Sequence, residues 1–206
     1  MIVSFCGIDG SGKSTVLTIV KGILEKKGYD VSIIDFMKNG NLTEEFNYLL
    51  QEKTNFKKIQ EVATLKSAAH ALDLYLGINK LKTENNYHTK IYLSHRMDMC
   101  FRVYANLCGA NIKYLSSIVK KMPTADLYVY INIEPEIAVE RIGGRSEPLS
   151  WKETEIHLKT ASVLYEQFLE SVEGKLVVIN NNQEIKENEI KNVIEKIDEF
   201  YRINRY

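Results

Sequence analysis

An eight-residue stretch near the start of the chain, Gly7-Ile8-Asp9-Gly10-Ser11-Gly12-Lys13-Ser14, constrains the fold more than any other feature. It matches the pattern G-x-x-x-x-G-K-[ST] in full, and it follows the short apolar run Ile2–Cys6. This pattern joins a buried strand to a helix, because its glycines let the backbone curl around an anion. The motif therefore predicts a strand–loop–helix unit. A glycine-rich turn without a ligand is the alternative interpretation.

The residue types in this motif are those that bind the phosphates of a nucleoside triphosphate. Successive backbone N–H groups of the curled loop point inward at phosphate oxygens, and the helix directs its positive dipole end at the same place. Lys13 supplies a positive charge for the β- and γ-phosphates, and the Ser14 hydroxyl is a ligand for Mg²⁺. We therefore expect ATP and Mg²⁺ as cofactors. The residues expected to bind them are Gly7, Asp9, Gly10, Ser11, Gly12, Lys13, Ser14 and Thr15.

Apolar runs alternate with amphipathic stretches along the chain, which is the pattern of parallel βαβ units. The runs expected as strands are Ile2–Cys6, Val31–Ile34, Ile91–Ser94, Leu127–Ile133 and Leu176–Ile179. The stretches expected as helices are Lys13–Lys27, Leu42–Leu50, Lys58–Leu81, Asp98–Leu107, Ile112–Lys120, one opening at Pro135, Trp151–Val172 and Glu184–Tyr201. The prediction is one α/β domain over residues 1–206, a P-loop NTPase fold of three α/β/α layers with a five-stranded parallel sheet.

The composition excludes several classes of protein. Lysine and arginine number 27, and aspartate and glutamate also number 27, so no basic excess favours nucleic-acid binding. No uninterrupted apolar run approaches the roughly 18 residues of a membrane span. Three scattered cysteines suit neither a disulfide framework nor a tetrahedral metal site. We expect a cytoplasmic protein that binds neither nucleic acid nor membrane.

Beyond the motif, the order of elements resembles the thymidylate kinase family over most of residues 1–180. Phe5–Thr15 is similar to the family's F-E-G-x-[DE]-G-x-G-K-[ST]. Ile91–Ala105 is similar to its strand followed by D-R-Y-x-x-S-x-x-A-Y-Q, and Ala125–Arg141 to P-D-L-x-[IL]-x-L-D-V-x-P-E-x-A-x-E-R. Members of the family transfer the γ-phosphoryl group of ATP to dTMP. The resemblance therefore implies a nucleoside monophosphate kinase.

The resemblance also implies roles for several charged residues, with surface ion pairs as the alternative. Asp9 occupies the place of the acidic residue that binds the acceptor's sugar hydroxyl, and Arg96 that of the D-R-Y arginine beside the transferring phosphates. Arg141 and Arg145 flank a LID loop at about 142–150. Either arginine would stabilise the charge of the transferring group, or Arg141 would lie along the adenine. With Lys13, these three arginines are the expected catalytic residues.

The acceptor side departs from the family pattern. Phe36 occupies the place of the phosphate-binding arginine in the family's R-E-P-G-G-T loop, and Lys38 is the nearest cation. His70 replaces the arginine that reaches the thymine, and Tyr104 stands where the family has an aromatic residue near the acceptor base. These four residues complete the expected substrate site. Structural core positions are the alternative for His70 and Tyr104.

The metal site departs from the pattern as well. His95 stands where the family has the aspartate of D-R-Y, and a histidine supplies no carboxylate to Mg²⁺. Hard cations prefer oxygen ligands, so another carboxylate has to take this place. Asp35 and Asp98 are the two candidates, and the sequence leaves both open.

Two kinds of function fit these observations. The first is ATP- and Mg²⁺-dependent phosphoryl transfer to a nucleoside monophosphate, with dTMP as the first candidate acceptor and another nucleotide or small phosphorylated acceptor as the alternative. The second is a nucleotide-binding regulatory NTPase with a vestigial acceptor site. The resemblance further implies a homodimer. Its contact surface would be Lys58–Leu81 or Phe101–Tyr104, although both are equally suited to packing within one chain.

Overall fold

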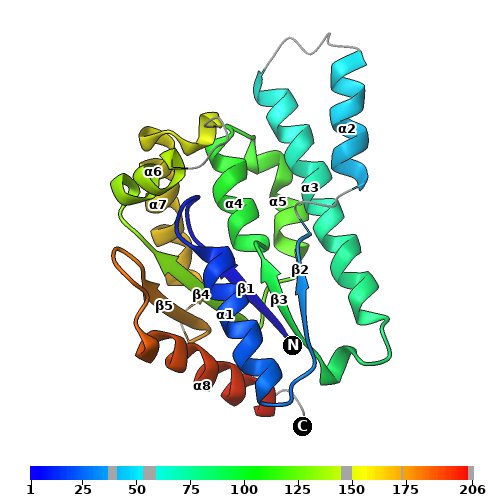
Figure 1. Cartoon of the computed structure of the whole chain (residues 1–206). Helices are drawn as coiled ribbons and strands as arrows, with labels where there is room; N and C mark the ends of the chain where they lie inside the picture. Colours follow the sequence, from blue (N-terminus) through cyan, green and yellow to red (C-terminus); the bar gives the residue numbers. More distant parts are fainter. Residues whose placement is uncertain (37–40, 53–58, 145–149, 173, 204–206) are drawn as a thin grey trace.

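The computed structural model describes residues 1–36, 41–52, 59–144, 150–172 and 174–203, and within them it has five parallel strands in one sheet. These are β1 (Ile2–Cys6), β2 (Val31–Ile34), β3 (Ile91–His95), β4 (Leu127–Asn132) and β5 (Leu176–Asn180). Their order across the sheet is β2-β3-β1-β4-β5, so that β1 is central (Figure 1). The expected strands are confirmed to within one residue at each end.

Helices cover both faces of the sheet, which confirms the three-layer α/β/α architecture. One face packs against α1 (Lys13–Lys26) and α8 (Glu187–Ile203). The other packs against α3 (Ile59–Lys82), α4 (Asp98–Leu107), α5 (Ile112–Lys121), α6 (Pro135–Gly143) and α7 (Glu155–Leu169). Beside α3 lies α2 (Asn41–Glu52), farther from the sheet (Figure 1). Three 3₁₀ turns are η1 (Tyr87–Thr89), η2 (Trp151–Glu153) and η3 (Glu170–Val172). None of the described helices is both long and apolar enough to cross a membrane.

The period-two pattern of β1 divides the core between the two faces. Val3 and Phe5 point into the cluster under α1 and α8, whereas Ile2 and Cys6 point into the cluster on the other side. All four side chains are buried. Because β1 is covered on both faces and lies between two other strands, the loop that follows it starts from the middle of the sheet.

Two local signals predicted helix ends correctly. Gly28 follows α1 with a φ of 86°, and its N–H donates to the Glu25 carbonyl oxygen at 2.9 Å. This is the left-handed conformation in which glycine commonly ends a helix. Pro135 is the first residue of α6, where the missing N–H of proline costs no hydrogen bond.

The single helix expected over Trp151–Val172 is wrong, because the structure divides it into η2, α7 and η3. Thr154 is extended, with φ of −72° and ψ of 152°, and it separates η2 from α7. A reciprocal cap begins η2: the Ser150 N–H donates to Glu153 Oε2 at 2.8 Å, and the Ser150 side chain accepts from the Glu153 backbone. After the extended Thr154, α7 begins as a separate helix.

Candidate active site

The loop between β1 and α1 lies at the carboxyl edge of the sheet, where ligands of open parallel sheets bind. Gly7 and Gly12 have φ angles of 141° and 88°. A Cβ atom at Gly7 would lie 2.5 Å from the Ile131 carbonyl oxygen, and one at Gly12 would lie 2.6 Å from Asn181 Nδ2. Glycine alone fits both the conformation and the space. The loop therefore curls tightly against β4 and the segment after β5.

Lys13, the first residue of α1, is buried in this loop. Its Nζ atom donates to the Gly7 carbonyl oxygen at 3.0 Å and to the Ile8 carbonyl oxygen at 2.7 Å. Burial, followed by the positive charge of Arg96, lowers the pKa of Lys13 to about 8. Carbonyl oxygens carry no full negative charge, so a phosphate group would supply the counter-charge that this ammonium lacks.

Asp9 and Arg96 form an ion pair beside Lys13. Arg96 Nη2 donates a proton to Asp9 Oδ1, and the Arg96 and Asp9 side chains are 15% and 9% exposed. Burial would raise the pKa of Asp9, but Arg96, Lys13 and Lys152 outweigh burial and lower this pKa to about 2. The carboxylate is therefore ionised at neutral pH, and it links the phosphate loop to the end of β3.

Arg96 is held in an unusual backbone conformation. Its φ of 80° is the one positive value among the described non-glycine residues. Such a residue costs on the order of 1–3 kcal/mol and persists where its surroundings hold it. Here the Ser94 hydroxyl donates to the Arg96 carbonyl oxygen at 2.6 Å, and the Arg96 N–H donates to the Phe5 carbonyl oxygen at 3.3 Å. The strained backbone directs the guanidinium group toward Asp9.

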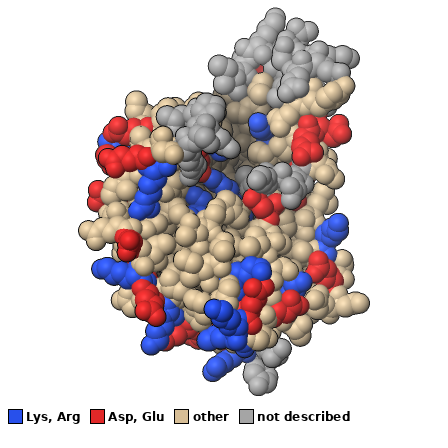
Figure 2. Space-filling view, viewed as in Figure 1, with Lys and Arg blue, Asp and Glu red and all other residues tan. Residues whose placement is uncertain are grey.

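Tyr104 of α4 lies next to this ion pair. The Arg96 guanidinium carbon is 4.9 Å from the centre of the Tyr104 ring, and Lys152 Nζ is 5.6 Å from it. Lys152 Nζ also lies 3.7 Å from Asp9 Oδ2. The Tyr104 hydroxyl and Asp9 Oδ2 are buried and make no hydrogen bond of normal geometry with the described residues. They are two polar atoms that a ligand could satisfy. Figure 2 shows lysine and arginine side chains at the bottom of a hollow on this face.

Ser14, His95 and Asp35 form a chain of polar contacts at the start of α1. Ser14 Oγ lies 3.1 Å from His95 Nε2, and His95 Nδ1 lies 3.5 Å from Asp35 Oδ2. Mg²⁺ in nucleotide sites uses one or two protein oxygens together with phosphate oxygens and waters. One hydroxyl and one carboxylate fit this requirement. In the described ranges, no group of three or more His, Cys, Asp or Glu side chains would hold a metal without the nucleotide.

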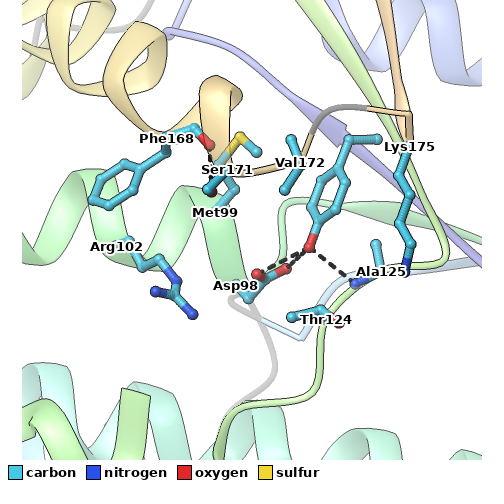
Figure 3. Close-up of a pocket in the computed structure, with 10 residues that line it drawn as sticks. Asp98, Met99, Arg102, Thr124, Ala125, Phe168, Ser171, Val172 and Lys175 are labelled. Carbon is cyan, nitrogen blue, oxygen red and sulfur yellow. Dashed lines mark hydrogen bonds between the residues drawn. The ribbon is translucent and has the colours of Figure 1, made fainter. Parts of the chain in front are cut away.

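Asp98, the other carboxylate considered for Mg²⁺, lies inside the core, which corrects that alternative. The Tyr128 hydroxyl contacts its two oxygens at 2.9 and 3.0 Å, and the residue is only 4% exposed (Figure 3). It lines a separate cavity of about 410 Å³, whose wall includes Thr124 before β4 and Lys175 before β5. This cavity therefore opens near the amino ends of β4 and β5, whereas the phosphate loop follows the carboxyl end of β1. Asp35 is the carboxylate near Ser14.

Burial of Asp98 gives a prediction for the pH dependence of stability. Burial raises the pKa of Asp98 to about 6, against the opposing hydrogen bond from Tyr128. Because the pKa is raised in the folded protein, the protonated carboxyl adds to the free energy of unfolding. This contribution is fully present below the unfolded pKa of 3.8, and it is lost as pH rises through about 6. The loss amounts to about 3 kcal/mol. We expect Asp98→Asn to remove this loss, so that the variant gains about 2.5 kcal/mol on the wild type between pH 4 and pH 7, because part of the loss already occurs below pH 4.

Urea unfolding at pH 4 and pH 7 measures this difference. Asn106→Ala, on the exposed side of α4, is the matched control because Asn106 carries no titratable group. Parallel stability curves for the wild type and Asp98→Asn would contradict the prediction.

Phe36, the first of the expected acceptor residues, packs onto α3. A Cβ atom at Gly77 would lie 2.5 Å from Phe36 Cδ1, so the ring lies directly on the backbone of α3. The side chain joins the apolar cluster on that face of the sheet. Phe36 thus fills space at the edge of the core, and it supplies no positive charge in place of the arginine expected from the family pattern.

The other predicted residues lie around this centre or outside the described ranges. Arg141 donates from Nη2 to the Gln183 carbonyl oxygen at 3.1 Å, so it lies against the segment after β5. His70 on α3 is partly buried, and burial, followed by the charge of Lys66, lowers its pKa. The residues that lie outside the described part of the chain are Lys38, Arg145 and most of the expected LID loop at 142–150.

Lys152 and Asn181 belong to this region but were not predicted. Asn181 is 4% exposed, and its Nδ2 donates to the Ser11 carbonyl oxygen at 2.8 Å, which supports the phosphate loop from the side of β5. Neither residue stands in a recognisable motif, and each is more than a hundred positions from its partner. The one available signal was that Asn181 follows an apolar strand, and thus lies at the carboxyl edge of the sheet.

Comparisons with known proteins agree with this geometry. A family model described as "Thymidylate kinase" matches residues 5–192. A "Probable thymidylate kinase" of Archaeoglobus fulgidus is 24% identical over 204 residues, which cover 95% of each chain. One of Sulfolobus acidocaldarius is 27% identical, covering 90% of this chain and 91% of the relative. A "Thymidylate kinase" of Caldanaerobacter subterraneus subsp. tengcongensis is 24% identical, covering 89% and 88%.

Proposed function

Because this chain belongs to the thymidylate kinase family, we propose that it transfers the γ-phosphoryl group of ATP to dTMP, yielding ADP and dTDP. One observation carries this proposal beyond family membership. The buried Asp9–Arg96 ion pair lies directly beside the phosphate loop and Lys13, so that cations from two strand ends converge on one point. Such convergence is what phosphoryl transfer needs, because its catalysis rests on positioning and on neutralising charge.

Each residue then has a part in the proposed transfer. The amides of the loop and Lys13 bind the β- and γ-phosphates, and Arg96 faces the transferring group. Ser14 would hold Mg²⁺ with Asp35 close by, and the metal, when bound, neutralises charge on the phosphate oxygens. Arg141 and Arg145 stay candidates for the closing loop or the adenine side. No nucleophilic side chain is required, because the acceptor phosphate oxygen attacks in line.

The acceptor is proposed to bind in the hollow beside Tyr104. Asp9 Oδ2 and the Tyr104 hydroxyl support this, since both are buried without a hydrogen bond of normal geometry and a sugar hydroxyl or a base edge would supply one. Lys152, beside Asp9, supplies a positive charge for the acceptor, whereas Phe36 carries no charge and packs on α3. His70 lies on α3 within electrostatic range of Lys152, and thus belongs to the same side of the site.

Release of ADP, measured with a panel of nucleoside monophosphates, tests the proposal. We expect dTMP to be phosphorylated with the highest kcat/KM. The departures at Phe36 and His70 favour a second candidate, a kinase for another nucleotide or small phosphorylated acceptor, which would appear as a different leading substrate. Equal background rates for every acceptor, with ATP still bound, would instead favour the regulatory NTPase.

Replacing Lys152 tests the acceptor side separately. We expect Lys152→Met to raise KM for the acceptor about tenfold, because a charged contact to a phosphate is worth about 1.5 kcal/mol, and to leave KM for ATP within twofold. Lys159→Met is the matched control, since Lys159 forms exposed ion pairs with Glu136 and Glu155 away from this hollow. An equal rise in both KM values for Lys152→Met would contradict the acceptor role.

The assembly and location form part of the same proposal. The outer side of α3 exposes large apolar side chains, and it supports a homodimer formed through this helix. These side chains are Leu65, Leu72, Tyr75 and Leu76. The alternative surface around Phe101–Tyr104 is less suitable, because Phe101 is only 1% exposed and packs in the core. We propose the cytoplasm as the location, where ATP and nucleoside monophosphates are available.

A further inference from the structure

Three polar residues from three different elements meet at the first turn of α1. Asp35 follows β2, His95 ends β3, and Ser14 is the second residue of α1. The two strands are neighbours, with Ile34 paired to Ser94, so their carboxyl ends present Asp35 and His95 side by side. The distances are 3.1 Å from Ser14 Oγ to His95 Nε2 and 3.5 Å from His95 Nδ1 to Asp35 Oδ2.

The order of these contacts selects one tautomer of the imidazole. A carboxylate only accepts hydrogen bonds, so wherever the ring is neutral its proton lies on Nδ1, which faces Asp35. Nε2 is then a hydrogen-bond acceptor, and the Ser14 hydroxyl donates its proton to Nε2. With its proton directed at Nε2, the hydroxyl oxygen turns its lone pairs away from His95. The imidazole therefore sets the direction in which Ser14 can act as a ligand.

We propose that His95, held by Asp35, is a positioning residue that orients the Ser14 oxygen for the Mg²⁺ of bound Mg·ATP. The inference rests on the proposed function, because it concerns the metal that would accompany the nucleotide. Outer groups that orient a metal ligand are worth 10–100-fold in metal affinity. Among these three side chains, the negative charge lies on Asp35, and the His95 ring separates it from Ser14. The site thus depends on the Ser14–His95 hydrogen bond and on the Asp35 carboxylate behind the ring, and not on a carboxylate in direct contact with Ser14.

Two amides of different length separate this role from simple packing. The side-chain amide of Gln reaches about as far as Nε2, so His95→Gln can still accept the Ser14 proton through its carbonyl oxygen. The shorter amide of Asn reaches only about as far as Nδ1, so His95→Asn can contact Asp35 but not Ser14. Both variants are polar and smaller than or similar in size to histidine. Thermal unfolding should show that both fold.

The readout is the gain in ATP affinity caused by Mg²⁺, taken as the ratio of Kd in EDTA to Kd in Mg²⁺. We expect His95→Asn and Asp35→Ala to reduce this gain about tenfold or more, with Kd in EDTA unchanged. We expect the Mg²⁺-dependent gain in ATP affinity of His95→Gln to stay within threefold of the wild-type value. His88→Ala is the matched control, because His88 is an exposed histidine in η1. In addition, ¹⁵N NMR of the free protein, at a pH where His95 is neutral, should show its proton on Nδ1 and not on Nε2.

Three results would overturn the inference, and they separate it from the proposed function. The same Mg²⁺-dependent gain in His95→Asn as in the wild type would overturn the inference while the proposed function stands. A neutral His95 ring with its proton on Nε2 would overturn it as well, because the Ser14 hydroxyl could then not donate to Nε2. A wild-type protein that binds no ATP, with or without Mg²⁺, would overturn the proposed function and this inference together.

Discussion

Lys13→Met is expected to lower kcat for acceptor-dependent ADP release by about 10²–10³-fold, the loss seen when one charge-stabilising group is removed from a transition state. Lys13 is the cation held inside the phosphate loop, and burial leaves little water to screen its charge. The fold should survive the change. Burial lowers the pKa of Lys13 to about 8, so its charged form is disfavoured in the folded protein, and this offsets part of the cost of losing its two hydrogen bonds.

The measurement is steady-state kcat at saturating acceptor, accompanied by thermal unfolding. Lys21→Met is the matched control, because Lys21 lies on the same helix in an exposed ion pair with Glu25. It should leave kcat unchanged. A Lys13→Met variant that turns over like the wild type would refute the phosphate-binding role of the loop.

Arg96→Met is expected to affect both stability and turnover. It leaves the Asp9 carboxylate buried without its main partner, and breaking such a pair costs about 3–5 kcal/mol. Lys152 also faces Asp9, so we expect the lower end, about 3 kcal/mol. We expect kcat to fall by about 10²–10³-fold, because the guanidinium group is lost beside the transferring phosphoryl group. Urea unfolding and ADP release measure the two effects on the same preparation.

A second substitution separates the two effects of Arg96. In the double variant Arg96→Met with Asp9→Asn, the buried charge is removed together with its partner, so most of the lost stability should return. Turnover should stay low, since neither residue is available to phosphate or acceptor. Recovery of turnover along with stability would show that Arg96 serves the fold alone.

The chain of contacts from Ser14 to Asp35 shows why part of the site was beyond sequence reasoning. Asp35 and Asp98 both follow strands closely, so sequence distance favours neither. The pairing of β2 with β3 brings Asp35 to His95, whereas the first turn of α4 points Asp98 at Tyr128, thirty residues away. A helix turns by about 100° per residue, so a shift of one position decides whether a carboxylate faces the ligand edge or the core.

The break at Thr154 is a similar case on a local scale. Helical spacing of apolar residues continues across Trp151–Val172, and the periodicity alone therefore predicts one helix. The extended backbone of Thr154 interrupts that continuation, and the cap at Ser150 begins a separate short turn before it. Lys152 lies in this separate turn, and its ammonium group reaches Asp9.

Contacts between residues close in the chain were determined by the sequence itself. The phosphate loop, the five strands, Gly28 and Pro135 depend on backbone conformations that a few neighbouring residue types dictate, and they could be predicted. Tertiary structure alone decided which distant side chains meet. Asp9 acquires Arg96 and Lys152, and Ser14 acquires His95 and Asp35, because parallel strands bring their carboxyl ends to one edge in an order that differs from the order of the chain. The charge of a residue alone does not predict which side chain it pairs with, because strand pairing and the rotation of each helix determine which side chains meet.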